Sequence, residues 1–91
     1  MLFRSTLTAD VFKDDVAMST ANVMAVANKR ANELGINVLN SLITITQYLR
    51  DGTMLWRVNY GPKDYLNRRG GDLIIDVDAA NGKIERVLWG Q

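Results

Sequence analysis

Apolar and acidic side chains alternate near the C-terminal end of the chain, in the run Asp-Leu-Ile-Ile-Asp-Val-Asp at residues 72–78. The apolar residues on one side of this run are Leu73, Ile75 and Val77. A period of two is typical of a strand with one buried face. Asn81-Gly82 follows and supplies the positive φ of a short hairpin turn. With the apolar run that comes next, residues 72–91 predict a β-hairpin with one apolar face.

Residues 8–34 have the spacing of an amphipathic helix. Apolar residues recur at intervals of four and seven and form one stripe, made of Phe12, Val16, Val23, Ala27 and Leu34. Thr8 or Asp10 is placed to cap the start of this helix, and Gly35 to end it. Because the strands need a cover for their apolar face, we expect the stripe to lie on a sheet rather than on a membrane or a partner helix.

Two more strands are predicted in the middle of the chain. Residues 36–50 form a long strand with apolar residues on both sides, so the pattern does not decide which side faces the core. Asp51-Gly52 is a strong hairpin signal. Residues 54–60 form the next strand, and Gly61-Pro62 ends it because proline cannot donate to a ladder.

In chain order these segments predict an α+β fold in a single domain over residues 1–91. One long N-terminal helix packs on a four-stranded antiparallel meander sheet. Residues 2–8 are compatible with a short edge strand and with an unstructured lead-in, and both remain open. Residues 63–71 are polar and predict a loop.

Composition excludes several classes of function. The chain has 91 residues, with eleven basic and ten acidic side chains, and its net charge of +1 gives no reason to expect a nucleic acid or an anionic membrane as partner. It has no cysteine and no histidine. Disulfides, Cys/His zinc sites, Ser-His-Asp and Cys-His nucleophile systems and histidine acid–base catalysis are therefore excluded. We expect no enzyme activity, no catalytic residue, no metal and no cofactor.

The compartment is less constrained by the composition. No apolar run of eighteen residues exists, so no membrane-spanning segment is expected. The first eight residues do not form a signal peptide. Absence of cysteine fits the cytosol, and the periplasm stays open if a leader has been removed.

Carboxylates gather on the last hairpin, where Asp76, Asp78 and Glu85 lie near one another in sequence. Such a group suits acid–base catalysis or oxygen ligation of a divalent cation. Asp76 and Asp78 point away from the apolar side, however, to the face expected to be solvated. Asp78 also starts the turn, where aspartate bonds nearby amides. A structural role of these carboxylates is therefore favoured. Arg57 lies on the outer face of its own strand, and we expect it to pair with them across strands.

Arg68-Arg69-Gly70-Gly71 is a candidate anion site, formed by guanidinium groups and loop amides. It lacks the spacing of a phosphate-binding loop, and no helix is predicted to follow it. A solvated loop is the favoured interpretation.

The outer face of the sheet is a candidate interface. If Trp56 and Ile75 face the helix, then Leu55, Ile74, Val87 and Trp89 lie together on the other side as an exposed apolar patch. The alternative is a β-bulge, which would exchange the two faces locally.

Several segments resemble small cystatin-like domains of bacteria. They are Trp56-Arg-Val-Asn-Tyr, Gly70-Gly-Asp-Leu-Ile-Ile-Asp-Val-Asp, Asn81-Gly-Lys-Ile and Gly90-Gln91. Over residues 56–91 the chain is similar to PepSY-type units and to immunity proteins with a nuclear-transport-factor-like fold. The resemblance implies a non-catalytic module, since PepSY-type units are associated with peptidase inhibition and immunity proteins block a cognate toxin.

The chain departs from true cystatins at their inhibitory loops. Gln47-Tyr-Leu-Arg-Asp-Gly stands in place of their Gln-x-Val-x-Gly loop, and Ala79-Ala-Asn-Gly replaces the loop that carries proline and tryptophan. No inhibitory residue is carried over, and inhibition of papain-like proteases is not implied.

Three functions follow from the sequence. The first is a protein-binding module, of inhibitor or immunity type, that acts through the outer sheet face. Its binding residues are expected to be Leu55, Arg57, Ile74, Val87 and Trp89. The second is self-association, through the same face or by strand exchange at the Asp51-Gly52 hairpin. The third is an enzyme or small-ligand binder that uses a cavity between helix and sheet.

Overall fold

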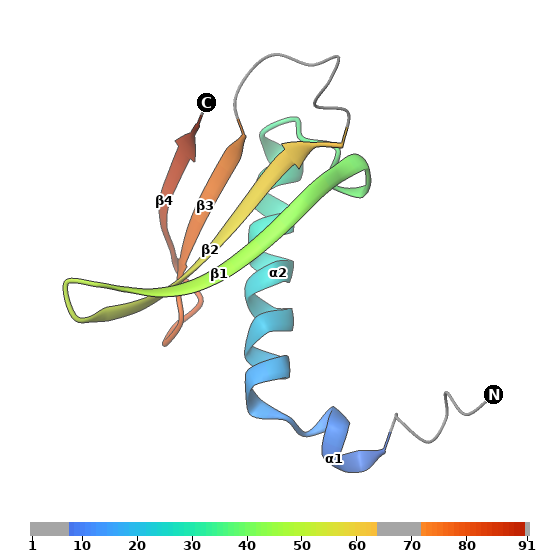
Figure 1. The fold of residues 1–91 in the computed structure, drawn as a ribbon, viewed down its shortest axis with the longest axis vertical. Coiled ribbons are helices and arrows are strands. Elements are labelled where there is room, and N and C mark those ends of the chain that lie inside the picture. The colour runs from blue at the N-terminus through green and yellow to red at the C-terminus, as the bar shows by residue number, and fades with distance from the viewer. Residues whose placement is uncertain (1–7, 64–71, 91) are drawn as a thin grey trace.

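A computed structural model describes residues 8–63 and 72–90. Its elements are α1 (Ala9–Phe12), α2 (Asp15–Glu33), the 3-10 turn η2 (Val38–Asn40), β1 (Ser41–Arg50), β2 (Thr53–Pro62), β3 (Leu73–Asp78) and β4 (Ile84–Trp89). The strands form one antiparallel sheet in the order β1-β2-β3-β4, and α2 covers one face of it (Figure 1). The predicted α+β class, with one main helix on a four-stranded antiparallel meander, is confirmed. The predictions for residues 2–7 and 64–71 lie outside the described residues.

The predicted single helix is divided into two helices, because the backbone is not helical at Lys13-Asp14. Asp14 has an extended backbone, and its side chain accepts a hydrogen bond from the Ala17 amide at 2.8 Å. This is the N-cap geometry, which satisfies an amide that would otherwise lack a partner in the first turn. The expectation that Thr8 or Asp10 caps the main helix is therefore wrong: Thr8 is at the N-cap position of the short α1 and makes no side-chain cap bond there.

Gly35 ends α2 as predicted. Its φ is +90°, a backbone conformation that glycine adopts without steric cost. The Ile36 amide donates to the Ala31 carbonyl at 2.9 Å and the Gly35 amide donates to the Asn32 carbonyl at 3.1 Å. These two bonds make a Schellman motif, which turns the chain back toward the sheet.

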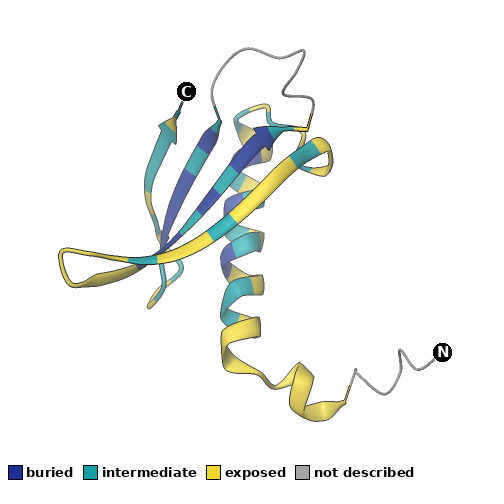
Figure 2. Ribbon diagram, in the orientation of Figure 1, coloured by how far each residue is buried: buried dark blue, intermediate teal, exposed yellow. Residues whose placement is uncertain are grey.

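Only the C-terminal part of the predicted apolar stripe lies on the sheet. Val23, Ala27 and Ala31 are buried, and the two alanines let the helix approach the strands closely. Phe12 and Val16, by contrast, are 62% and 66% exposed. Figure 2 shows why, because the N-terminal part of α2 extends past the edge of the sheet. The prediction that one stripe from Phe12 to Leu34 forms the buried face is therefore wrong.

The first hairpin confirms the Asp51-Gly52 signal and corrects the strand ends. Both turn residues have positive φ, +52° and +81°, as in a type I′ turn. Residues 38–40 form the η2 turn instead of strand, so β1 starts at Ser41. On the other strand, pairing with β1 continues past the predicted end, to Pro62 opposite Ser41.

The strand register settles which sides face the core. Ile45 lies opposite Val58, which lies opposite Ile75, which lies opposite Val87. Directly paired residues share one face of a sheet, and this row belongs to the face that packs on α2. The core consists of Val23, Ala27, Ala31, Trp56, Val58, Tyr60, Leu73, Ile75 and Val77.

A β-bulge interrupts the last hairpin. Asp76 lies opposite Arg86, but the next residue, Val77, lies opposite Ile84, so that Glu85 is an extra residue in β4. Gly82, with φ +72°, supplies the positive φ of the preceding turn. The bulge changes the side of the sheet to which every later residue of β4 points.

Candidate protein-binding face

The face of the sheet opposite α2, here called the open face, carries only half of the predicted apolar patch. Leu55 and Ile74 lie on its side of the sheet, but Leu55 is only 3% exposed, so the prediction that it forms part of an exposed patch is wrong. Val87 and Trp89 lie opposite Ile75 and Leu73, on the helix side. The prediction that the four residues share one face is wrong, and the bulge at Glu85 is the reason. The bulge places Leu88, opposite Ile74, on the open face instead.

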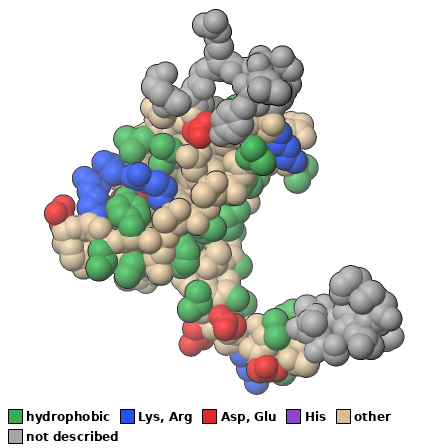
Figure 3. Space-filling model, viewed as in Figure 1, with side chains coloured by type: hydrophobic (Ala, Val, Ile, Leu, Met, Phe, Trp, Pro, Cys, Tyr) green, Lys and Arg blue, Asp and Glu red, His purple; other side chains and the backbone are tan. Residues whose placement is uncertain are grey.

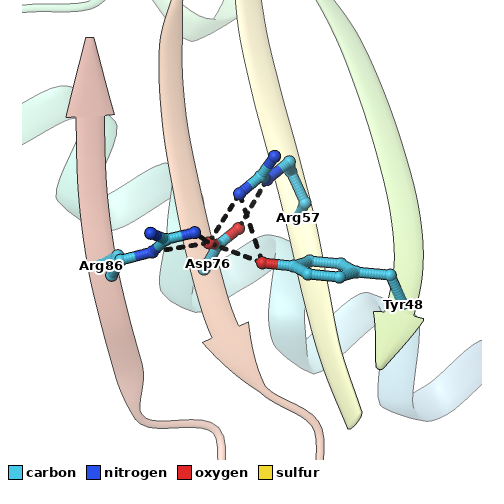
Figure 4. Close-up of polar contacts among 4 residues, drawn as sticks. All are labelled: Tyr48, Arg57, Asp76 and Arg86. Carbon is cyan, nitrogen blue, oxygen red and sulfur yellow. Dashed lines mark hydrogen bonds and ion pairs between the residues drawn. The ribbon is translucent and has the colours of Figure 1, made fainter. Parts of the chain in front are cut away.

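A buried carboxylate lies at the centre of the open face. Asp76 is fully buried although no described helix covers this side, so the expectation of a solvated side chain is wrong. Its neighbours on the adjoining strands cover it: Arg57 of β2, Arg86 of β4 and the more distant Tyr48 of β1 (Figure 4). One side chain from each strand thus meets at this point.

The contacts to Asp76 are direct hydrogen bonds. Arg57 donates from Nε to Oδ1 at 2.9 Å and from Nη2 to Oδ2 at 3.0 Å, a two-point contact that fixes both groups. Tyr48 donates its hydroxyl hydrogen to Oδ2 at 2.9 Å. Arg86 donates to the same oxygen from Nε at 3.3 Å and from Nη2 at 3.2 Å. The expected cross-strand pairing of Arg57 with a carboxylate is confirmed.

Arg57 is held on a second side by Tyr48. Its guanidinium carbon lies 5.0 Å from the centre of the Tyr48 ring, and its Nη2 donates to the Tyr48 hydroxyl oxygen at 3.2 Å. A cation over an aromatic face is attracted by the ring quadrupole. The two side chains therefore hold each other in place above the sheet.

The network determines the protonation state of its carboxyl group. Burial alone would raise the pKa of Asp76, but the hydrogen bonds from Arg57, Tyr48 and Arg86 outweigh burial and hold this pKa below its usual range. The hydrogen bond to Asp76 likewise raises the pKa of Arg57, although burial opposes it. At neutral pH the site is therefore one carboxylate between two guanidinium cations.

Two cations around one carboxylate leave one positive charge in excess. The side chains of both arginines stay 35% exposed. Within the described part of the chain, Nη1 of Arg57 and Nη1 of Arg86 have no hydrogen-bond partner. Figure 3 shows basic side chains gathered beside hydrophobic ones on the face turned toward the viewer. The arrangement can receive an anionic group from outside.

The other carboxylates of the last hairpin act within the chain. Asp78 accepts a hydrogen bond from the Ala80 amide at 2.7 Å, which confirms its expected role in the turn. Asp78 and Glu85 line a shallow hollow together with Arg50. Across residues 8–63 and 72–90, no three acidic, histidine or cysteine side chains come together in a way that could hold a metal ion.

Core side chains of α2 and of the sheet pack together between the two layers. A separate, open groove of about 680 Å³ runs between α2 and the β3–β4 turn, with Met18, Asn22 and Ala80 in its walls. Asp15 is the one ionisable side chain among the described residues that line it.

Sequence reasoning missed Tyr48, Arg86 and Leu88. The register between paired strands places each of them on the open face. For Arg86 and Leu88 the register also depends on the bulge in β4. Arg68 and Arg69, the candidate anion site, lie outside the described residues. No described helix is both long and apolar enough to cross a membrane.

Comparisons of the chain with protein-family models, with curated proteins and with solved structures find no match. The fold and the open face are therefore the basis for any functional argument.

Proposed function

We propose that this chain is a non-catalytic protein-binding module whose open face contacts an anionic group of its partner. The observation that carries the proposal is the pair of half-exposed guanidinium groups around Asp76, each with a free Nη1. Arginine and tyrosine are enriched among the residues that contribute most to protein interfaces. Here both lie at the centre of a face that no described element covers.

Apolar neighbours support the same interpretation. Ile74 and Leu88, both partly exposed, flank the arginine row, which consists of Arg57, Asp76 and Arg86, so the polar donors lie beside apolar surface on that side. Asp76 holds both guanidinium groups, and Tyr48 also holds that of Arg57. The two arginine side chains therefore lose little conformational entropy when a partner binds. A carboxylate or phosphate that reaches Nη1 of either arginine would complete its hydrogen bonds.

The resemblance to small cystatin-like domains of bacteria extends this proposal to an inhibitor or immunity-type protein. In that case the partner is a peptidase or a toxin encoded nearby. Purified products of the neighbouring genes provide the direct assay, and stoichiometric inhibition of one of them is the expected result. Binding without inhibition would support the proposed binding function and exclude the inhibitory role.

The open face is tested by site-specific photo-cross-linking in cells of the organism that encodes the chain. A photoreactive residue at position 88 reports on the open face, and one at position 16 reports on the exposed end of α2. We expect one protein to be captured from position 88 and not from position 16. Capture from position 16 alone would contradict the proposal.

The charge requirement is tested with the captured protein after purification. Arg86→Ala removes one guanidinium group from the open face, while Lys83→Ala removes a cation from the exposed turn of the same hairpin. We expect Arg86→Ala to raise the Kd at least about tenfold and Lys83→Ala to leave it unchanged. Equal affinities of the two variants would exclude the arginine pair as the binding site.

A further inference from the structure

The two edges of the sheet differ in how well they are protected against pairing with another strand. Within the described residues β1 and β4 are the edge strands. An edge strand presents unpaired amide and carbonyl groups, and proteins usually shield it with charges, proline, bulges or short length. β4 has six residues, two charged side chains and the bulge at Glu85.

β1 has only one of these protections, the charge of Arg50 at its last position. It is ten residues long, and positions 41–49 read Ser-Leu-Ile-Thr-Ile-Thr-Gln-Tyr-Leu, without charge or proline. Its pairing with β2 is regular from end to end. Leu42, Ile43 and Leu49 are 47%, 38% and 65% exposed. A long, regular, apolar and uncharged edge is the kind that pairs with a second strand.

We propose that β1 pairs antiparallel with β1 of a second copy of this chain, forming a two-fold dimer with one continuous eight-stranded sheet. A two-fold axis perpendicular to the sheet keeps each residue on its own face. Both α2 helices then lie on one side of the joined sheet, and both open faces lie on the other. The interface uses the backbone edge of β1 and not the side chains of Arg57, Asp76 and Arg86, and it does not depend on the proposed function.

The side chains of β1 are complementary to their own two-fold copies. With the axis at Ile45 or at Thr46, Arg50 of each copy lies opposite Asn40 or Leu42 of the other, so the two arginines are kept apart. Every other pair within positions 41–49 is between uncharged residues. Cross-strand pairs of β-branched and apolar residues stabilise a sheet, and like charges directly opposite destabilise it. An unrelated acidic or basic strand would lack this match.

The dimer is also closed. Pairing uses both β1 edges, and the outer edges of the joined sheet are then the two β4 strands, which carry charges and the bulge. An isologous contact of this kind stops at two copies. The expected mass in solution is therefore twice the 10.2 kDa of one chain.

Cysteine scanning tests the pairing, since the chain has no cysteine of its own. Single cysteines at positions 44, 45 and 46 are oxidised under mild conditions, with Thr53→Cys, in β2, as control. Residues directly opposite each other across the axis have the separation that a disulfide needs. We expect a covalent dimer from one of the three positions and none from position 53. Equal yields at all four positions, or no covalent dimer, would overturn the proposal.

Light scattering on the unmodified chain gives the second test. The double variant Thr44→Lys/Thr46→Lys places lysines opposite each other whether the axis lies at 44, 45 or 46, and we expect it to be monomeric. Thr8→Lys/Ala21→Lys adds the same charge at exposed positions away from β1 and should remain dimeric. Circular dichroism checks that both variants fold, and the cysteine scan remains decisive if one does not. A monomeric wild-type chain at millimolar concentration, or an open-ended assembly, would refute the dimer.

Discussion

Asp76 is the residue on which the open face depends. It is fully buried, and its charge is balanced by Arg57 and Arg86. Asp76→Asn keeps the shape but leaves two guanidinium groups next to each other without a counter-charge. Removing one partner of a buried ion pair costs several kcal/mol, and we expect about 3 kcal/mol here because both arginines are partly solvated. Urea unfolding at pH 7 measures it, and Asp78→Asn, which keeps its acceptor for the Ala80 amide, should stay within about 0.5 kcal/mol of wild type.

The same residue gives the chain a sensitivity to acid. Because the folded state lowers the pKa of Asp76, the unfolded chain takes up its proton first as the pH falls. The stabilisation is present above the ordinary aspartate pKa and is lost as the pH falls through the lower folded value. Asp76→Asn should therefore lose less stability than wild type between pH 5 and pH 2. A parallel decline of the two proteins would show that Asp76 is not the responsible group.

Tyr60 produces the opposite dependence at high pH. It lies in the core, and its hydroxyl donates to Asn28 Oδ1 at 2.7 Å. Burial raises the pKa of Tyr60 to about 12. The stabilisation is complete below the ordinary tyrosine pKa of about 10 and falls as the pH rises toward the folded value, by at most about 3 kcal/mol. Tyr60→Phe should be about 1 kcal/mol less stable at pH 8 and should lose less between pH 9 and pH 11, as judged by urea unfolding.

At the scale of elements, α2 packs with only part of its length. Val23 lies against the sheet, whereas Phe12, in the short α1 that precedes α2, is exposed. Val23→Ala should lower the free energy of unfolding by about 2 kcal/mol, and Phe12→Ala should change it by less than about 0.5 kcal/mol. Thermal and urea unfolding of the two variants measure this difference. A large loss in Phe12→Ala would mean that α1 is covered after all.

The strands show which features of the sheet the sequence pattern predicts and which it does not. Residues 72–78 have apolar side chains at every second position, and the Asp51-Gly52 turn is specific, so both hairpins and the meander could be predicted. β1 has apolar residues at both parities, and only its register with β2 assigns Ile45 to the core. The bulge at Glu85 depends on how β4 fits β3 and has no signal of its own in the sequence. The pairing of Arg57 with a carboxylate was therefore predictable, while that of Arg86 was not.

At the scale of the whole molecule, the proposed dimer has a thermodynamic consequence. A chain that pairs only when folded is stabilised by its own concentration, because association draws the equilibrium away from the unfolded state. The midpoint of thermal unfolding should rise by roughly 5–10 °C over a hundredfold increase in wild-type concentration. Thr44→Lys/Thr46→Lys should show no such rise, and Thr8→Lys/Ala21→Lys should behave as wild type does.

Arg86→Ala separates this dimer from the proposed partner binding in the same experiment. Arg86 lies on β4, three strands away from the β1 edge, and its side chain points out of the sheet toward the open face. Its removal should leave the concentration dependence intact while it weakens partner binding. If Arg86→Ala abolishes the concentration dependence, the copies associate through their open faces instead. The arginine row would then be a self-association site, and the β1 edge would have to be solvated in the dimer.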